Sequence, residues 1–288
     1  MIDLQNHTIA SDGECTAEEL VDLAIKMNLK AIAITDHDSI DSVKAAIEYS
    51  KGKNIEIITG VELSCDDPLF KHDKIDVLGL FIDIENKKLN DLLDHISNKR
   101  EENKKQIIKK LNDLGYGISY EDVKKTVKGT FGNPHIAKYL IKKYPDKFSS
   151  VSEFFIKLIG KGKPAFLGNY SRASIKDGIK IIKEASGIAI LAHPGVYKRE
   201  ESIKLIDYFI GNGGDGIETY YPYHIICREL NIDKKGNEDM INFYKDIAKS
   251  KRILESGGND HHGDRFTLGE VKIPDEVLER LKKRIPIS

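Results

Sequence analysis

Short apolar runs rich in β-branched residues recur along the chain, and segments with helical periodicity separate most of them. A short apolar run with polar residues or glycine on both sides is typical of a buried strand. The runs lie at 2–5, 31–35, 55–60, 75–80, 187–192, 215–220 and 252–256. Because a parallel neighbour needs a long return path, strands that alternate with helices predict parallel pairing. Seven such runs favour a (β/α) barrel or a doubly wound sheet.

The segments between the strands predict amphipathic helices, of which 16–28 is the clearest. Thr16 and Glu19 have the spacing of a capping box. One apolar stripe follows, and Asn28 suits the exit from the helix. Further helices are predicted at 39–50, 174–185, 200–211 and 237–250.

The alternation of strands and helices breaks once, between residues 80 and 187, where the sequence has little strand character. Helical patterns appear there at 86–114, 120–126, 134–143 and 151–159. We therefore expect a barrel formed by 1–85 and 165–288. We also expect a helical insertion at 86–164 that caps the active-site face of that barrel.

The composition describes a soluble globular protein, with 40% apolar and 32% charged residues among 288. Its three cysteines have no paired or metal-knuckle spacing and are expected to be reduced thiols. The first residues already resemble a core strand, so we expect no signal peptide and a cytoplasmic protein without membrane contact. A formal net charge of −1 argues against a partner as long and as anionic as a nucleic acid, but not against a small phosphorylated ligand.

Histidine, aspartate and glutamate side chains gather where the predicted strands end. The carboxyl ends of parallel strands share one face of an α/β protein, and active sites form there. For any single residue of this kind, capping or turn chemistry is an equal alternative, whereas the whole set on one rim points to a site. The set comprises His7, Asp12, Asp36, His37, Asp38, Glu62, Asp76, His193, Glu218, His224, Asp260, His261 and His262.

Imidazoles mixed with carboxylates, without thiolates, are borderline-to-hard metal ligands. The set is larger than one catalytic ion requires, so the sequence predicts two or three divalent ions. Such a cluster lowers the pKa of bound water and binds the oxygens of a phosphoryl group.

The motifs "DLQNHTIASDG", "TDHDS", "GVELS", "VLGL", "AHPG", "DGIETYYPYH" and "GGNDHHG" resemble, in order, those of the PHP family of polymerase and histidinol phosphatase domains. The resemblance is closest to small stand-alone phosphoesterases with a helical insertion, some of which act on nucleoside bisphosphates or short RNA. It implies a distorted (β/α)7 TIM-like barrel with a trinuclear metal centre.

The resemblance also implies which residues bind each ion. The first ion would have Gln5, His7, Glu62 and Asp260 as ligands. The second would have Glu62, Asp76 and His193. The third would have Asp12, His37 and His262.

Two of these positions depart from the family pattern, because Gln5 and Asp76 stand where histidine is usual. We interpret both as a shift toward harder ions, manganese or iron in preference to zinc. The alternative is that the first ion binds poorly and activity is reduced or altered.

The residues that would hold substrate also depart from the family pattern. Asn133, in "GNPHIAKYL", and Val196, after "AHPG", stand where arginine is common. Arg199 is a nearby source of positive charge. His224 is a candidate general acid, and His135 is either a substrate contact or an ordinary N-terminal helix residue.

The leading hypothesis is a metal-dependent phosphoesterase that hydrolyses small phosphate monoesters such as nucleotides, with a hydroxide bridging the ions. The first alternative is a 5′-3′ exoribonuclease acting on short RNA. The second is a non-catalytic nucleotide-binding or regulatory protein with a degenerate metal site.

Overall fold

The computed structural model describes residues 1–70, 72, 74–127, 129–168, 172–263 and 268–285. The chain forms two compact units. Unit 1 comprises Met1–Asp91 and Ala173–Ser288, and unit 2 is the continuous segment Leu92–Arg172.

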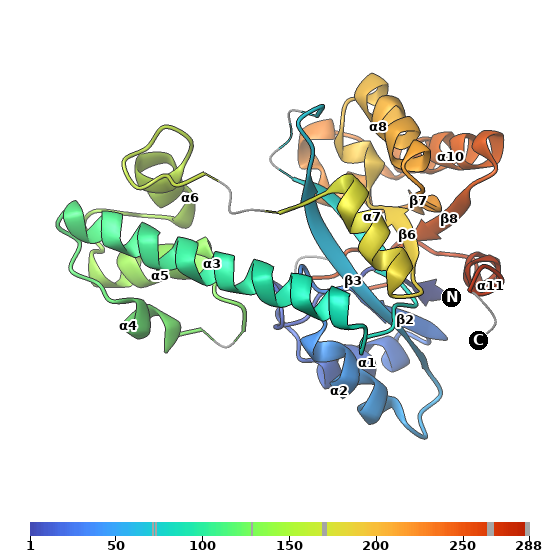
Figure 1. Ribbon diagram of the computed structural model, residues 1–288, viewed down its shortest axis with the longest axis horizontal. Coiled ribbons are helices and arrows are strands. Elements are labelled where there is room, and N and C mark those ends of the chain that lie inside the picture. The colour runs from blue at the N-terminus through green and yellow to red at the C-terminus, as the bar shows by residue number, and fades with distance from the viewer. Residues whose placement is uncertain (71, 73, 128, 169–171, 264–267, 286–288) are drawn as a thin grey trace. The chain divides into compact units, whose positions relative to one another are not determined.

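Unit 1 is built on one curved sheet with the strand order β1-β2-β3-β4-β6-β7-β8, and the short β5 pairs with β3 beside this path (Figure 1). The strands are β1 (Ile2–Asp3), β2 (Ala31–Ile34), β3 (Glu56–Asp66), β4 (Ile75–Leu80), β5 (Ala173–Ser174), β6 (Ile188–Leu191), β7 (Gly216–Tyr220) and β8 (Leu254–Gly257). The seven strands of the main path curl into a nearly closed barrel, which confirms the predicted α/β barrel.

The two ends of the sheet meet between β1 and β8. The amide of Leu4 donates to the carbonyl of Gly257 at 3.0 Å, and Asn6 and His261 form a parallel bridge. Gly258 makes this approach possible, because a Cβ there would lie 2.3 Å from the Cβ of Gln5. The glycine therefore brings the segments that follow the first and last strands into contact.

One strand corrects the prediction of purely parallel pairing. β4 runs antiparallel to both of its neighbours, β3 and β6. Only residues 67–74 join β3 to β4, which is enough for a hairpin and too short for a helical crossover. The start of β4 therefore lies at the same rim as the ends of the parallel strands.

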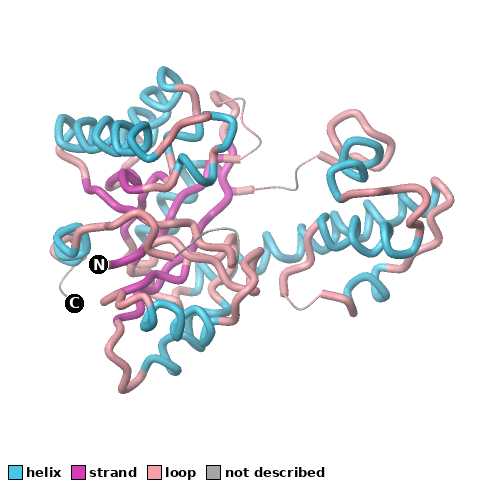
Figure 2. The backbone as a smooth tube through the Cα atoms, turned by 180° about the vertical axis from the view of Figure 1, so that it is seen from behind, coloured by secondary structure: helices cyan, strands magenta, loops and turns pink. Residues whose placement is uncertain are grey.

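Helices surround this sheet, as Figure 2 shows for the strands and helices of unit 1. The alternate residues of β2 point to opposite faces. Ala31 and Ala33 pack into the barrel core, whereas Ile32 and Ile34 pack against helix residues such as Leu20. Both faces are buried, which explains the continuous apolar run.

Five helices of unit 1 agree closely with the predicted segments, whereas α9 and α11 were not predicted. The capping box of Thr16 and Glu19 is present. The α-helices are α1 (Ala17–Lys26), α2 (Asp41–Ser50), α7 (Ile175–Glu184), α8 (Arg199–Gly211), α9 (Tyr223–Ile226), α10 (Lys234–Lys251) and α11 (Asp275–Lys282). Short 3₁₀ turns lie at η2 (Pro194–Val196) and η3 (Arg228–Leu230).

Unit 2 has a hydrophobic core of its own, in which Leu111, Leu140 and Phe154 are fully buried. α3 (Lys87–Asp113) begins in unit 1 and continues into unit 2. The other elements are α4 (Tyr120–Lys124), α5 (Asn133–Lys143), α6 (Val151–Phe154) and the π-helix η1 (Phe155–Ile159). A single stretch of chain thus supplies all of the residues of this core.

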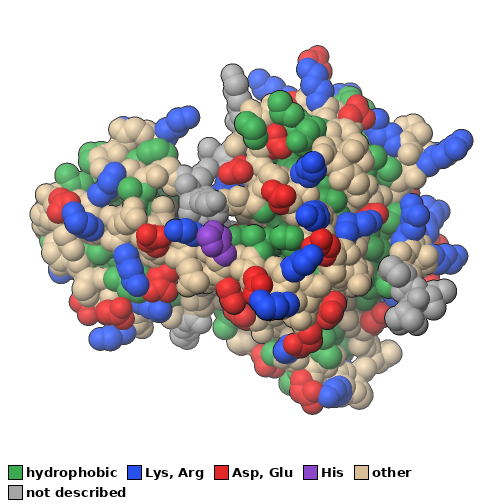
Figure 3. Space-filling model, in the orientation of Figure 1, with side chains coloured by type: hydrophobic (Ala, Val, Ile, Leu, Met, Phe, Trp, Pro, Cys, Tyr) green, Lys and Arg blue, Asp and Glu red, His purple; other side chains and the backbone are tan. Residues whose placement is uncertain are grey.

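Positive and negative side chains are mixed over the face drawn in Figure 3, in keeping with the small net charge. Among the described residues, no helix is both long enough and apolar enough to cross a membrane.

Lys104, on α3 in unit 2, is only 5% exposed. Burial, together with the charges of Arg100 and Arg172, lowers the pKa of Lys104 from 10.5 to about 8. The unfolded chain therefore binds the proton more tightly than the native chain, so the free energy of unfolding rises as the pH increases from about 8 to about 10.5. We expect Lys104→Met to raise the free energy of unfolding at pH 7 by about 1–3 kcal/mol. Denaturation in urea, followed by circular dichroism, measures this change.

Lys109→Met is the matched control, because this side chain lies on the same helix and is 78% exposed. The difference between wild type and Lys104→Met should shrink as the pH rises above 8. A difference that does not depend on pH would mean that shape, rather than charge, decides the stability at this position.

Candidate metal centre

The rim of the barrel collects side chains from six strands of the main sheet. His7 and Asp12 follow β1, His37 follows β2, and His193 and Asp260 follow β6 and β8. Glu62 lies inside β3, which is longer than the apolar run that predicts it, and a bridge pairs this residue with His37. Asp76 is the second residue of β4 and reaches the same rim because that strand is antiparallel.

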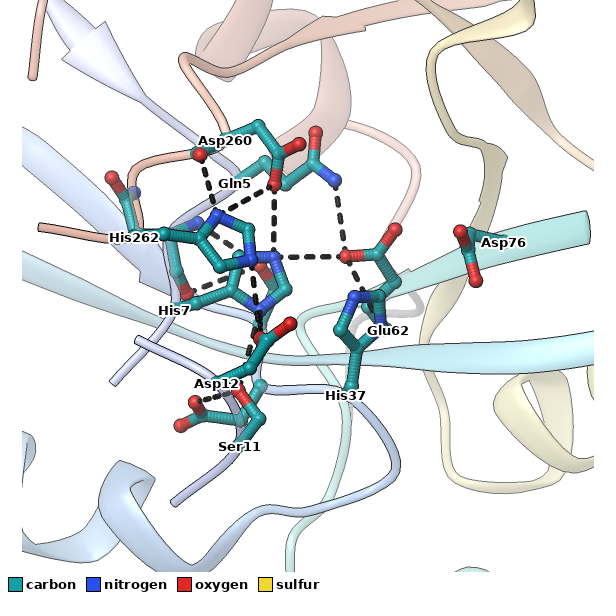
Figure 4. A network of polar contacts seen from close by, with 12 residues as sticks. Gln5, His7, Ser11, Asp12, His37, Glu62, Asp76, Asp260 and His262 are labelled. Carbon is teal, nitrogen blue, oxygen red and sulfur yellow. Dashed lines mark hydrogen bonds and ion pairs between the residues drawn. The ribbon is translucent and has the colours of Figure 1, made fainter. Parts of the chain in front are cut away.

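His7, Glu62 and Asp260 form the first group of possible ligands (Figure 4). The Nε2 atom of His7 lies 3.0 Å from Oε2 of Glu62 and 3.1 Å from Oδ1 of Asp260. His7 and Glu62 are completely buried. These are three of the four residues that the resemblance assigns to the first ion.

Gln5, the fourth of those residues, contacts Glu62 through its amide nitrogen. Its Nε2 atom donates to Oε2 of Glu62 at 3.1 Å, and the side chain is completely buried. The Oε1 atom has no hydrogen-bond partner among the described residues. The amide thus holds the carboxylate in place and leaves one oxygen available.

Glu62 also belongs to a second group, with His37 and Asp76. The Nε2 atom of His193 lies 3.2 Å from Oε1 of Glu62 and 3.8 Å from Oδ2 of Asp76. Two members of the second predicted set, Glu62 and Asp76, thus group with His37. The third member, His193, lies beside the other oxygen of Glu62.

The third group contains Asp12, His37 and His262, as predicted, together with His7. The Nε2 atom of His262 lies 3.1 Å from Oδ1 of Asp12. The rings of His7 and His262 stack with their centroids 4.1 Å apart. His7 therefore borders both the first and the third group.

Several buried atoms at this rim have the character of metal ligands. Nε2 of His7, Nδ1 of His37 and Oε1 of Gln5 have no hydrogen bond of acceptable geometry within the described part of the chain. Nε2 of His7 nevertheless lies within 3.1 Å of two carboxylates. The atoms are close enough for hydrogen bonds, but they are not aligned for them. Buried imidazole nitrogens that lack hydrogen bonds and lie among carboxylates fit a shared cation, and this mixture of ligands suits a borderline or hard ion.

The charges of the rim stabilise one another. Burial alone would lower the pKa of His7, but the adjacent carboxylates of Asp260 and Glu62 raise that pKa well above its usual value. Burial alone would raise the pKa of Glu62, but the charge of His37 and hydrogen bonds from His193 and His7 lower it well below its usual range. For His193, burial would lower the pKa, but the hydrogen bond to Glu62 and the charges of nearby carboxylates together raise the pKa to about 9. Because a metal binds deprotonated imidazole, ion binding must release these protons.

Two of the predicted ligands adopt unusual backbone conformations. His193 has a φ of 28° and Asp260 has a φ of 49°. Residues other than glycine rarely adopt positive φ, and such strain concentrates at functional sites. At both positions the conformation directs a side chain toward Glu62 or His7.

Two further residues orient these groups: Glu218, which belongs to the predicted set, and Tyr221, which sequence reasoning misses. The hydroxyl of Tyr221 donates to Oδ2 of Asp260 at 2.8 Å. Glu218 is completely buried, which raises its pKa well above the usual value, and it accepts from the amide of His193 at 2.9 Å. Tyr221 follows directly on β7, so the sequence offers only a weak signal for its contact.

Asp36, another of the residues at the strand ends, supports an imidazole indirectly. Its carboxylate accepts from the Thr8 amide at 2.7 Å and from the Ser11 hydroxyl at 2.6 Å. The Oγ atom of Ser11 lies 3.4 Å from Nδ1 of His7. Asp36 therefore fixes the loop that carries His7.

The three residues predicted to act on substrate have other contacts. Arg199 lies over the ring of Phe243, with 4.2 Å from its guanidinium carbon to the ring centroid. Nε2 of His224 lies 3.8 Å from Oε1 of Glu270. His135 belongs to unit 2, where its Nδ1 atom accepts from the Gly132 amide at 3.1 Å and caps α5. Catalytic roles for these three residues stay predictions.

Comparison with known proteins gives this rim its context. Residues 3–187 match the model of the PHP domain. The chain belongs to the PHP family. A 5′-3′ exoribonuclease of Haemophilus influenzae is 35% identical over 287 residues, covering 99% of this chain and 97% of that protein. A 3′,5′-nucleoside bisphosphate phosphatase of Chromobacterium violaceum is 28% identical over 91% of this chain and 87% of its own.

A solved structure agrees with the PHP assignment. It is that of a protein proposed to be a metal-dependent phosphoesterase from Bifidobacterium adolescentis. The two structures align with a TM-score of 0.79 and 25% identity, over 98% of this chain and 96% of the other. This PHP protein is a metal-dependent phosphoesterase, and thus a hydrolase.

We expect Tyr221→Phe to weaken metal binding by about 10–100-fold, because it removes a hydrogen bond that orients a ligand while keeping the ring. The expected loss concerns the ion that Asp260 contacts. Titration of the metal-free protein with Mn²⁺ against a competing chelator measures the affinity.

Tyr244→Phe serves as the control. This tyrosine is also buried, and its hydroxyl lies 3.1 Å from that of Ser202, away from the predicted ligands. Equal affinities for wild type and Tyr221→Phe would show that Asp260 needs no such support.

Proposed function

We propose that this PHP protein is a 5′-3′ exoribonuclease that releases nucleotides from short RNA, with Mn²⁺ or Fe²⁺ at its metal centre. The carrying observation is the 35% identity with the Haemophilus influenzae exoribonuclease, which extends over nearly the full length of both chains. The similarity therefore includes the segment that forms unit 2, as well as the barrel.

The ligand assignment supports the choice of ions. His7, Glu62 and Asp260 would bind the first ion, and Glu62, Asp76 and His193 the second. Asp12, His37 and His262 would bind a third. When bound, such ions activate water as a nucleophile and stabilise charge on the phosphoryl oxygens. Carboxylate oxygens outnumber imidazoles in the first two sets, which favours a hard ion over zinc.

The surrounding residues hold these ligands in position for hydrolysis of a phosphate ester. Gln5 and Tyr221 each donate to a carboxylate of the centre, at 3.1 Å and 2.8 Å. Both carboxylates thus have a fixed orientation before substrate arrives, and preorganised charges are more effective than mobile ones. The buried floor of the rim, around His7 and Glu62, keeps water away from one side of the ligand set.

A second candidate function is hydrolysis of small phosphate monoesters such as nucleoside bisphosphates. It is favoured by the net charge of −1, since a long polyanion gains little from such a protein. It is also favoured by the similarity to the Chromobacterium violaceum phosphatase. The two candidates share the chemistry of the metal centre and differ in the leaving group.

We expect 5′-phosphorylated oligoribonucleotides, from the dinucleotide upward, to be shortened with release of 5′-mononucleotides. A chelator should abolish the reaction and Mn²⁺ should restore it, because carboxylates and imidazoles without a bound cation do not lower the pKa of water. Chromatography of the products from substrates of increasing length measures this reaction.

Adenosine 3′,5′-bisphosphate is the matched substrate for the second candidate, and inorganic phosphate is its product. Phosphate release without any shortening of RNA would replace the exoribonuclease with the phosphatase. If neither substrate reacts with the protein in its metal-loaded state, the assignment of activity to this centre is wrong.

Gln5→His tests whether the unusual first ligand is a retuned position or a decayed one. An imidazole is a softer and stronger ligand than an amide oxygen, so we expect zinc affinity to rise by about tenfold or more. The variant also loses the hydrogen bond to Glu62, so turnover supported by Mn²⁺ should not increase.

A large increase in Mn²⁺-supported turnover on introducing histidine would instead indicate a decayed centre. The non-catalytic alternative would then describe the natural protein. Gln106→His is the control for the chemical change itself, because residue 106 lies on α3 in unit 2.

A further inference from the structure

The positively charged side chain of Lys74 lies beside the second group of possible ligands, His37, Glu62 and Asp76. Lys74 directly precedes β4, two residues before Asp76. Its Nζ atom lies 2.9 Å from Oδ2 of Asp76 and 3.3 Å from Nε2 of His37. His37, Glu62 and Asp76 could together hold an ion. Two of them, His37 and Asp76, are therefore in contact with the ammonium group of Lys74.

The backbone of Lys74 is held beside the site, while its side chain is 42% exposed. The carbonyl of Lys74 accepts from the hydroxyl of Tyr197 at 3.5 Å. Asp76, which is 3% exposed, receives a second hydrogen bond from the hydroxyl of Ser64 at 3.2 Å. The carboxylate is thus fixed on one side by a strand neighbour and on the other by the ammonium.

The number of negative charges in the centre limits how many divalent ions can bind beside Lys74. The centre contains four carboxylates, those of Asp12, Glu62, Asp76 and Asp260. Two divalent ions already neutralise four negative charges. A third ion beside the Lys74 ammonium, at hydrogen-bonding distance from the same carboxylate, would meet strong repulsion.

We propose that Lys74 takes the place of one divalent ion, so that the centre binds two ions and the ammonium serves as the third cation. The inference rests on the ligand assignment of the proposed function, with one change: Lys74 replaces the second ion, to which Asp76 was assigned. It does not rest on the substrate. It accounts for the aspartate at position 76, where the family usually has histidine. A carboxylate pairs with an ammonium group, whereas a neutral imidazole is a ligand for a metal ion. In this role Lys74 is a positioning residue that determines the metal content.

The test is the number of ions bound per chain, measured by elemental analysis after loading with Mn²⁺ and removal of excess metal by dialysis. We expect two ions in the wild type and three in Lys74→Met, which keeps the length of the side chain and removes its charge. We expect Lys74→Arg to bind two ions, because it keeps the charge. Thermal unfolding identifies a variant that fails to fold, and Lys74→Gln then replaces Lys74→Met.

Lys44→Met is the matched control, because this lysine of unit 1 is 65% exposed and pairs with Glu85. Three ions in wild type and Lys74→Met alike, or two in both, would overturn the role of Lys74 and leave the hydrolytic function intact. Absence of bound metal from every variant would overturn the ligand assignment and this inference together. Loss of RNA hydrolysis with the expected ion counts would contradict only the proposed substrate.

Discussion

The carboxylate of Glu62 is the interaction on which the rest of the rim depends. One of its oxygens lies beside His7 and Gln5, and the other lies beside His193. A completely buried carboxylate is costly unless charges or donors compensate it. Every neighbour of Glu62 therefore acts both as a stabilising partner of a buried charge and as part of a binding site.

The closure of the barrel and the direction of β4 bring the neighbours of Glu62 together. Its closure brings the segment after β1 against the segment after β8, so that Nε2 of His7 lies 3.1 Å from Oδ1 of Asp260. The antiparallel β4 provides Asp76 from the start of a strand instead of its end. The metal centre is thus a consequence of how the sheet closes as much as of the residue types that line it.

Much of this arrangement can be predicted from the sequence, because strand position and side-chain type are local properties. His7, Glu62, His193 and Asp260 can be recognised by where they fall relative to apolar runs, and the structure brings them together. The direction of β4 could not be obtained from its apolar pattern, which is the same for either orientation. Only the short connection before it carried that information.

Other features depend on distances that no local pattern encodes. The contact of Tyr221 with Asp260 joins two segments that are 39 residues apart. Arg199 and His224 follow strands of the barrel, as expected for functional residues, yet they pack against Phe243 and Glu270. A position near the end of a strand determines at which end of the barrel a residue lies. The direction of its side chain depends on the turn that follows the strand.

The pairing of β4 with β3 sets a limit on how this protein can change. Asp76 lies opposite Ser64, and the strand is held from its other side by β6. Successive residues of a strand face opposite sides, so a slip by one position would turn Asp76 away from the rim and present Val77 in its place. Insertions or deletions that shift this register by an odd number of residues would therefore exchange a cation-binding group for an apolar one, even with every ligand still encoded in the gene.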